Sequence, residues 1–184
     1  NMPYTPPYIR LHEEGTLAER AASIYSLMKH CTICPHRCGV DRLAGDKGKC
    51  RSGVSPVVSA VQRHMGEEAC LVGRRGSGTI FFTNCNLACI FCQNYDISHE
   101  GRGEEMSFDE LADAMLSLQG RGCHNINLVT PTHMVYGIVM ALGRAVEKGL
   151  RIPLVYNSGG FDSVETLELL EGIVDIYMPD FKYM

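Results

Sequence analysis

Seven of the nine cysteines lie in two short segments of the chain. Three of them, Cys85, Cys89 and Cys92, form a C-x3-C-x2-C pattern. Three thiolates can bind three irons of a four-iron–four-sulfur (4Fe–4S) cluster and leave the fourth iron without a protein ligand. Electron-carrying clusters normally use four cysteines, so this pattern predicts an open iron that can bind a substrate or cofactor. The alternatives are a zinc site that borrows Cys70 or a histidine, and three buried thiols.

A second set of cysteines precedes this pattern. Cys31, Cys34, Cys38 and Cys50 are spaced C-x2-C-x3-C-x11-C. Four thiolates saturate a zinc ion or all four irons of a cluster, so the set predicts a closed site for structural support or electron relay. The spacing slightly favours an auxiliary 4Fe–4S cluster, because zinc sites more often pair two C-x2-C units. His36 could replace one thiol. Outside both sets, Cys70 and Cys123 are expected to be buried small hydrophobic residues.

Composition excludes several classes of protein. The chain has 184 residues, a formal net charge of -4 and 45% hydrophobic residues, enough for one core or a core with a small appendage. The lack of a basic surplus argues against nucleic-acid binding through bulk charge. No apolar run approaches the roughly 18 residues that span a membrane, and no basic-then-apolar leader opens the sequence. We therefore expect a cytoplasmic protein with reduced thiols.

The elements that position these cysteines alternate along the chain. Continuous apolar runs and amphipathic stretches predict parallel strands covered by helices. The first strand leads directly into Cys85, and Ser107 with Glu110 forms a capping box. Because the sequence stops on the fourth strand, we expect a partial (β/α) barrel without its later strands. The predicted strands are 78–84, 125–130, 152–157 and 173–181, and the predicted helices are 107–119, 134–149 and 163–172.

The remainder divides into an N-terminal part and the barrel. Residues 1–15 contain three prolines and predict an irregular arm, and residues 16–30 predict a helix with a capping box of Thr16 and Glu19. The run at 55–61 is short, apolar and β-prone. The predicted units are an arm and helix (1–30), a cysteine-rich metal-binding segment (31–53) and an α/β partial barrel (54–184).

The segment CNLACIFC resembles the C-x3-C-x-aromatic-C signature of radical S-adenosylmethionine (SAM) enzymes. The longer stretches GSGTIFFTNCNLACIFCQNYDIS, LVTPTH and VDIYMPDFKY are similar to the activases of glycyl radical enzymes, and most similar to their PflX-like relatives. The resemblance implies that Cys85, Cys89 and Cys92 hold a 4Fe–4S cluster whose open iron binds SAM. Reduction then cleaves SAM to methionine and a 5′-deoxyadenosyl radical, which abstracts a hydrogen atom. Phe91 would lie near the adenine, and Asn94 continues the motif.

The resemblance also implies SAM contacts after the second, third and fourth strands. At the first of these positions no carboxylate is present, so hydroxyls and backbone carbonyls would accept the hydrogen bonds. Thr132 could instead be an ordinary helix N-cap, and Lys182 a solvated or carboxylate-paired lysine. Asn157 replaces an acid of the family pattern, so we expect no cation site there. The implied cofactor contacts are Thr130, Thr132, Asn157, Ser158 and Asp180.

A histidine and two acids precede the cluster strand. His64, Glu67 and Glu68 could orient a substrate or transfer protons, or they could belong to a solvated loop.

Several activities are compatible with this sequence. The resemblance implies hydrogen abstraction, with a glycine of a partner enzyme as one hydrogen donor, and a low-potential electron donor such as flavodoxin or ferredoxin. A peptide, nucleoside or small metabolite is the alternative substrate. A protein of another class, a non-catalytic iron–sulfur or zinc protein that carries electrons or binds a partner, would be indifferent to SAM.

Overall fold

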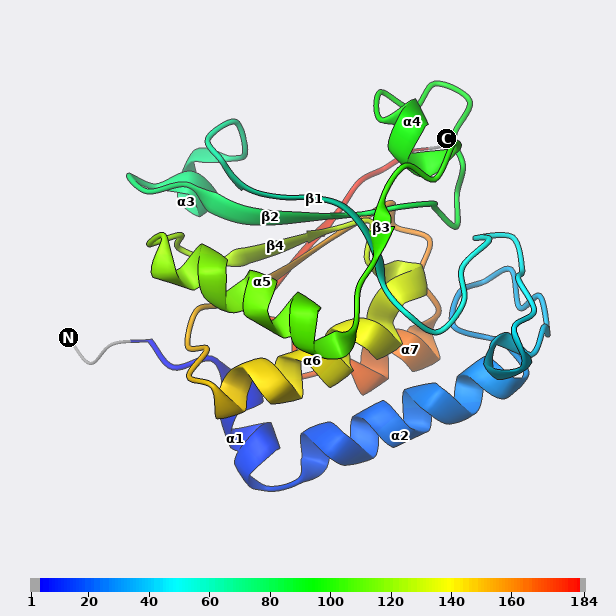
Figure 1. The fold of residues 1–184 in the computed structure, drawn as a ribbon, viewed down its shortest axis with the longest axis horizontal. Coiled ribbons are helices and arrows are strands. Elements are labelled where there is room, and N and C mark those ends of the chain that lie inside the picture. The colour runs from blue at the N-terminus through cyan, green and yellow to red at the C-terminus, as the bar shows by residue number, and fades with distance from the viewer. Residues whose placement is uncertain (1–3, 183–184) are drawn as a thin grey trace.

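The computed structural model describes residues 4–182, which form a six-stranded sheet with helices on one face (Figure 1). The strand order is β3-β1-β2-β4-β5-β6. All neighbouring pairs from β2 to β6 are parallel, as the sequence predicts. The α/β class with a mostly parallel sheet is therefore confirmed. The four parallel strands are β2 (Ser77–Phe82), β4 (Ile126–Val129), β5 (Leu154–Ser158) and β6 (Ile176–Pro179).

Two antiparallel strands extend this sheet beyond β2. The β-prone run at 55–61 forms most of β1 (Val57–His64), which pairs with β2 and with β3 (Glu104–Glu105). Residues 65–76 connect β1 to β2 and contain only one helical turn, and β2 returns antiparallel beside β1. The register shifts between Val58 and Ala60, which bends β1 near the end of β2 that leads to the cysteines.

The helices form two layers below the sheet (Figure 1). The inner layer contains α5 (Phe108–Gly120), α6 (Val135–Glu147) and α7 (Val164–Leu169). The outer layer contains α1 (Pro7–Glu13) and α2 (Thr16–Lys29), and α2 packs on α6. No helix within residues 4–182 is long and apolar enough to cross a membrane. The remaining short helical turns are η1 (Arg42–Ala44), α3 (Ala69–Val72), α4 (Tyr95–Ser98) and η2 (Thr132–Met134).

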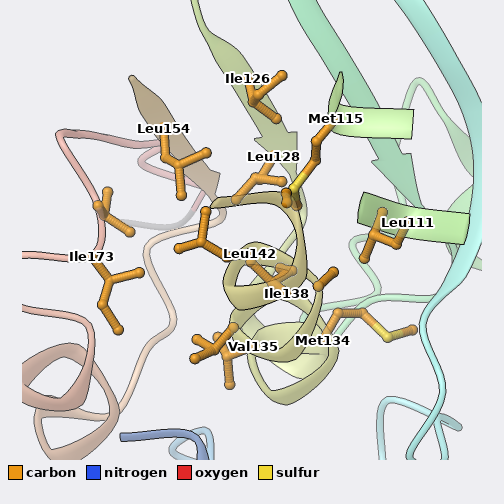
Figure 2. Close-up of a cluster of buried hydrophobic side chains, with 14 of the residues drawn as sticks. Leu111, Met115, Ile126, Leu128, Met134, Val135, Ile138, Leu142, Leu154 and Ile173 are labelled. Atoms are coloured by element: carbon orange, nitrogen blue, oxygen red, sulfur yellow. The ribbon is translucent and has the colours of Figure 1, made fainter. Parts of the chain in front are cut away.

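The core lies between the sheet and the inner helices. Alternation along β4 places Ile126 and Leu128 on the helix-covered face, where both are fully buried. Figure 2 shows these two side chains with Leu111 and Met115 of α5 and Leu142 of α6 in one apolar cluster. This burial is the main force that holds the strands and helices in place.

The helix starts show one predicted cap and one error. Ser107 and Glu110 form the predicted capping box on α5, with Ser107 N donating to Glu110 Oε2 over 2.7 Å. The predicted box at Thr16 is wrong, because Gly15 is the N-cap of α2 and makes no side-chain cap. The irregular arm is also wrong over 7–13, where α1 forms. Pro7 at its first position has the φ that a helix start requires. Residues 1–3 of that arm lie outside the described residues.

Candidate radical SAM site

A cavity of about 640 Å³ lies where the parallel strands end. The carboxyl ends of parallel strands meet at one edge of a sheet, which is where α/β proteins commonly bind ligands. The loop after β2 contributes the three cysteines of the C-x3-C-x2-C pattern, and the hairpin before β2 contributes Glu67. The ends of β4, β5 and β6 contribute Thr130, Asn157 and Asp180. Segments distant in sequence thus share one wall.

The three-cysteine loop owes its shape to residues around it. The backbone turns sharply at Asn84 and Ala88, which have positive φ values of 62° and 50°. Asn84 N donates to Ile97 O over 2.9 Å and closes the loop, while Cys92 N donates to Cys89 O over 3.1 Å. These bonds place the thiols of Cys85, Cys89 and Cys92 on the cavity wall.

The surroundings of the thiols suit iron ligation. Burial raises the pKa of Cys85, and the backbone N–H groups of Ala88 and Leu87 lower it again. Leu87 N lies 3.3 Å from Cys85 Sγ, and Ser98 Oγ lies 3.2 Å from Cys92 Sγ. Donors directed at sulfur stabilise the thiolate that iron requires, so this donor set fits a 4Fe–4S cluster. Within residues 4–182, no three His, Cys, Asp or Glu side chains are gathered closely enough to hold one metal ion.

Most of the implied cofactor contacts line the cavity. Phe91 stands at its edge, with 69% of its surface exposed. A Cβ on Gly159 would lie 2.3 Å from Leu87 Cδ1, so a glycine lets the end of β5 pack directly against the cysteine loop. The implied contacts found on the wall are Phe91, Asn94, Thr130, Asn157, Ser158 and Asp180.

Thr132 differs from the other implied contacts. It is fully buried and does not line the cavity, because its hydroxyl donates to Asp162 Oδ1 over 2.6 Å. It also begins η2 and makes no side-chain cap, so the N-cap alternative is wrong. Asp162 additionally accepts hydrogen bonds from Tyr156 and Ser158. This carboxylate, which sequence reasoning missed, therefore fixes β5 to the loop after β4.

Thr130 occupies a strained backbone position. Its φ is 58°, a left-handed value that is rare for threonine. Thr130 N donates to Asn157 O over 2.9 Å, which joins the ends of β4 and β5 where both line the cavity. Strain of this kind is often found at ligand sites, where the surrounding structure holds it in place.

Charged side chains stand on the β6 side of the cavity. Lys182 Nζ forms an ion pair with Asp180 Oδ2 at 2.5 Å, as the paired-lysine alternative predicts. The hydrogen bond to Asp180 raises the pKa of Lys182, and the nearby thiols of Cys89 and Cys92 raise it further. The ammonium group of Lys182 therefore lies close enough to the thiols of Cys89 and Cys92 to interact with them electrostatically.

The histidine and two acids before β2 also line this cavity. Burial raises the pKa of Glu67, while the nearby His64 lowers it and Glu68 raises it. A carboxyl group with a raised pKa beside an imidazole can give or take a proton closer to neutral pH than an exposed one. The structure thus brings His64, Glu67 and Glu68 to the site.

The cysteines outside the C-x3-C-x2-C pattern differ in how deeply they are buried. Cys31, Cys34 and Cys50 are buried and Cys38 is half-buried. His36 donates from Nε2 to Asn86 O over 2.7 Å, so that ring nitrogen already has a partner. Cys123 is buried as expected. The expectation for Cys70 is wrong, because its side chain is exposed at the start of α3.

Comparison with known proteins assigns this site to a family. The sequence profile of the Radical SAM superfamily matches residues 79–183, more than half of the chain, so the chain belongs to the radical SAM superfamily. The uncharacterized protein MJ0674 of Methanocaldococcus jannaschii is 36% identical over 173 residues. That match covers 86% of this chain and 47% of the relative, so the chain spans about half of the relative's length. No solved structure matches the chain. Membership implies an enzyme that uses a 4Fe–4S cluster and SAM.

Proposed function

We propose that this chain cleaves SAM reductively at a 4Fe–4S cluster held by Cys85, Cys89 and Cys92, and directs the resulting radical to a hydrogen atom of a substrate. One observation carries the proposal. Three cysteines, not four, stand on the wall of a cavity at the carboxyl ends of the parallel strands. A three-cysteine set leaves one iron free for the amino and carboxylate groups of SAM.

The cavity wall supplies groups for the rest of the cofactor. When bound, the cluster supplies the electron that breaks the sulfonium C–S bond. Thr130 and the amides of Asn94 and Asn157 can hydrogen-bond the polar groups of SAM, and Phe91 offers an apolar ring to the adenine. Apolar side chains such as Phe81 and Val129 also line the cavity.

The finer proposal concerns the substrate. Similarity of the cysteine loop to the activases supports a glycine of a partner enzyme as the hydrogen donor, with a peptide, nucleoside or small metabolite as the alternative. His64, Glu67 and Glu68 are the groups that could orient a substrate from the β1–β2 side. A low-potential protein such as flavodoxin or ferredoxin would supply the electron, and the exposed Ile90 offers it apolar surface beside the cysteines.

The test is electron paramagnetic resonance on anaerobically reconstituted, reduced protein, combined with an assay for 5′-deoxyadenosine. We expect a cluster signal that shifts when SAM is added, together with formation of 5′-deoxyadenosine. Cys89→Ala should abolish the shift and the product. Cys70→Ala, which alters an exposed thiol outside both cysteine sets, should retain them. A cluster signal that is indifferent to SAM would contradict the proposal and indicate an electron carrier.

A further inference from the structure

The segment 31–53 is arranged around its cysteines. It contains almost no regular structure apart from η1, yet three of its four thiols are buried. Cys31 N donates to Val40 O, and Gly39 N donates to Cys31 O, which folds the first three cysteines into a tight turn. The backbone N–H of Ile33 lies near the Cys31 thiol, and that of His36 lies near the Cys34 thiol. Nearby N–H dipoles stabilise a thiolate more than a neutral thiol.

The four thiols also lie near one another. The thiol of Cys34 lies close enough to the thiols of Cys50, Cys31 and Cys38 to interact with each of them electrostatically. A Cβ on Gly48 would lie 2.4 Å from Cys38 Sγ, so the backbone before Cys50 packs directly on that thiol. The last cysteine, distant in sequence, is thereby brought back to the first three.

A buried cation accompanies this group. Arg42 is 2% exposed and donates from Nε to Gly53 O and from a terminal nitrogen to His133 O. Its guanidinium also lies near the Cys31 thiol. Burying a positive charge among carbonyls is costly unless negative charge lies nearby. Four thiolates with bound metal carry such charge, whereas four neutral thiols do not.

We propose that Cys31, Cys34, Cys38 and Cys50 form a second metal centre, closed by four thiolate ligands, that fixes the three-cysteine loop in position. Both zinc and a 4Fe–4S cluster accept four thiolates.

Residues next to these cysteines bind the backbone of the three-cysteine loop. His36, two residues after Cys34, donates to Asn86 O, directly after Cys85. Arg51, directly after Cys50, donates to Ser98 O over 2.9 Å and to His99 O over 2.6 Å. The two contacts hold both ends of the loop that carries the cavity thiols. A metal that orders the first segment would therefore also order the second.

The test measures metal content and cluster signals of anaerobically reconstituted variants of the 184-residue chain. Cys34→Ala/Cys50→Ala should lose about four irons, or one zinc if the centre is zinc, relative to the wild type. Cys70→Ala should lose none. Metal content equal to that of the wild type in the double variant would overturn the proposal.

Loss of metal in Cys34→Ala/Cys50→Ala could also result from misfolding, so a second variant tests the centre with its four cysteines intact. Cys89→Ala/Cys92→Ala disables the three-cysteine set and leaves residues 31–53 intact. It should retain the metal of the second centre, with an iron signal that does not respond to SAM, or one zinc and no signal. A folded variant without bound metal would overturn the proposal, whatever the wild type does with SAM.

Loss of the second centre should also make the 85–99 loop more susceptible to limited proteolysis. Unchanged cleavage would contradict the positioning role.

Discussion

At the residue scale, the cysteines depend on neighbours that contribute no ligand. Ser98 is buried on α4, and its hydroxyl reaches Cys92 Sγ. The same hydroxyl lies 2.8 Å from His99 Nδ1, and Arg51 donates to the backbone carbonyl oxygens of both Ser98 and His99. Hydrogen bonds to a ligating sulfur reduce the electron density at the cluster and make it easier to reduce.

Ser98→Ala is expected to lower the reduction potential of the cluster, because it removes the hydroxyl that donates to Cys92. The shift should be up to about 60 mV, since about 1.4 kcal/mol corresponds to 59 mV for one electron. A redox titration followed by electron paramagnetic resonance measures it. Ser98→Thr retains the hydroxyl and should stay near the wild-type potential. An equal potential in Ser98→Ala would show that this contact does not tune the cluster.

His133 gives the fold a sensitivity to acid. It is completely buried, and burial lowers its pKa from 6.5 to about 4. The unfolded chain therefore takes up a proton below pH 6.5 that the folded chain does not take up until about pH 4. The contribution of the neutral His133 to the free energy of unfolding is fully present above pH 6.5. It is lost as the pH falls from 6.5 to about 4, which lowers the free energy of unfolding by on the order of 3 kcal/mol in total.

Denaturant unfolding of the wild type and of His133→Gln between pH 7 and pH 4 checks this expectation. The variant lacks the titrating imidazole, so the free energy of unfolding should fall less steeply with decreasing pH. His124→Gln, at an exposed position, is the control. Parallel curves for the wild type and His133→Gln would contradict the assignment to His133.

The candidate site could be predicted from sequence only in part. The cysteines were predictable because their spacing along the chain sets which thiols can share a cluster. Asp162 and Ser98 were not, because their contacts arise only after folding. Asp162 meets Thr132, which is 30 residues away, and nothing in the local sequence marks it. Thr132 shows the opposite error, because position after a strand does not reveal which way a hydroxyl points.

At the scale of elements, the apolar pattern of the sequence predicted the helices and strands whose apolar side chains are buried in the core. Helices α5 and α6 and strands β2, β4 and β5 were predicted for this reason, whereas β6 was predicted from its apolar run although most of its residues are exposed. The strand β1 was seen only as β-prone, since its residues are mostly half-buried or exposed and show no clear alternation. Helix α1 was missed because its prolines suggested an irregular arm, although proline suits a first helical position.

The passage from the cysteine loop into β3 depends on a glycine. A Cβ on Gly103 would lie 2.2 Å from Thr83 Cγ2 and 2.7 Å from Val58 O, so the strands and this turn leave no room for a side chain. Gly103→Ala should destabilise the protein by about 1–3 kcal/mol and reduce retention of the cluster. Denaturant unfolding and iron analysis measure these two effects.

Gly120→Ala is the matched control for this substitution. Gly120 ends α5, and a Cβ there would meet nothing within 4 Å. Alanine favours the helix more than glycine does, so this variant should be as stable as the wild type or slightly more stable. If both variants behave alike, the close packing around Gly103 does not limit stability.

At the scale of the whole molecule, α6 connects the layers. It packs against α5 and against α2 of the outer layer, and its buried face contributes to the central cluster (Figure 2). Leu142→Ala should therefore lower the free energy of unfolding by about 2–5 kcal/mol. The loss should appear as one cooperative transition at lower denaturant concentration, followed by circular dichroism. Ala114→Gly, on a half-buried position of α5, should cost only about 1 kcal/mol. Two separate transitions in Leu142→Ala would show that the layers unfold independently.

The N-terminal part is bound mainly to residues far along the chain. Tyr8 donates to Ile152 O and Arg20 to Glu168 O, while Thr32 O and Ile33 O accept from Ser163 and Thr166. During synthesis these first residues leave the ribosome long before their partners exist. Until α7 has emerged, the backbone between Cys31 and Cys34 lacks these partners. The proposed second metal centre would therefore be completed only after residues 163–166 have been synthesised, and metal delivery to it should follow that point.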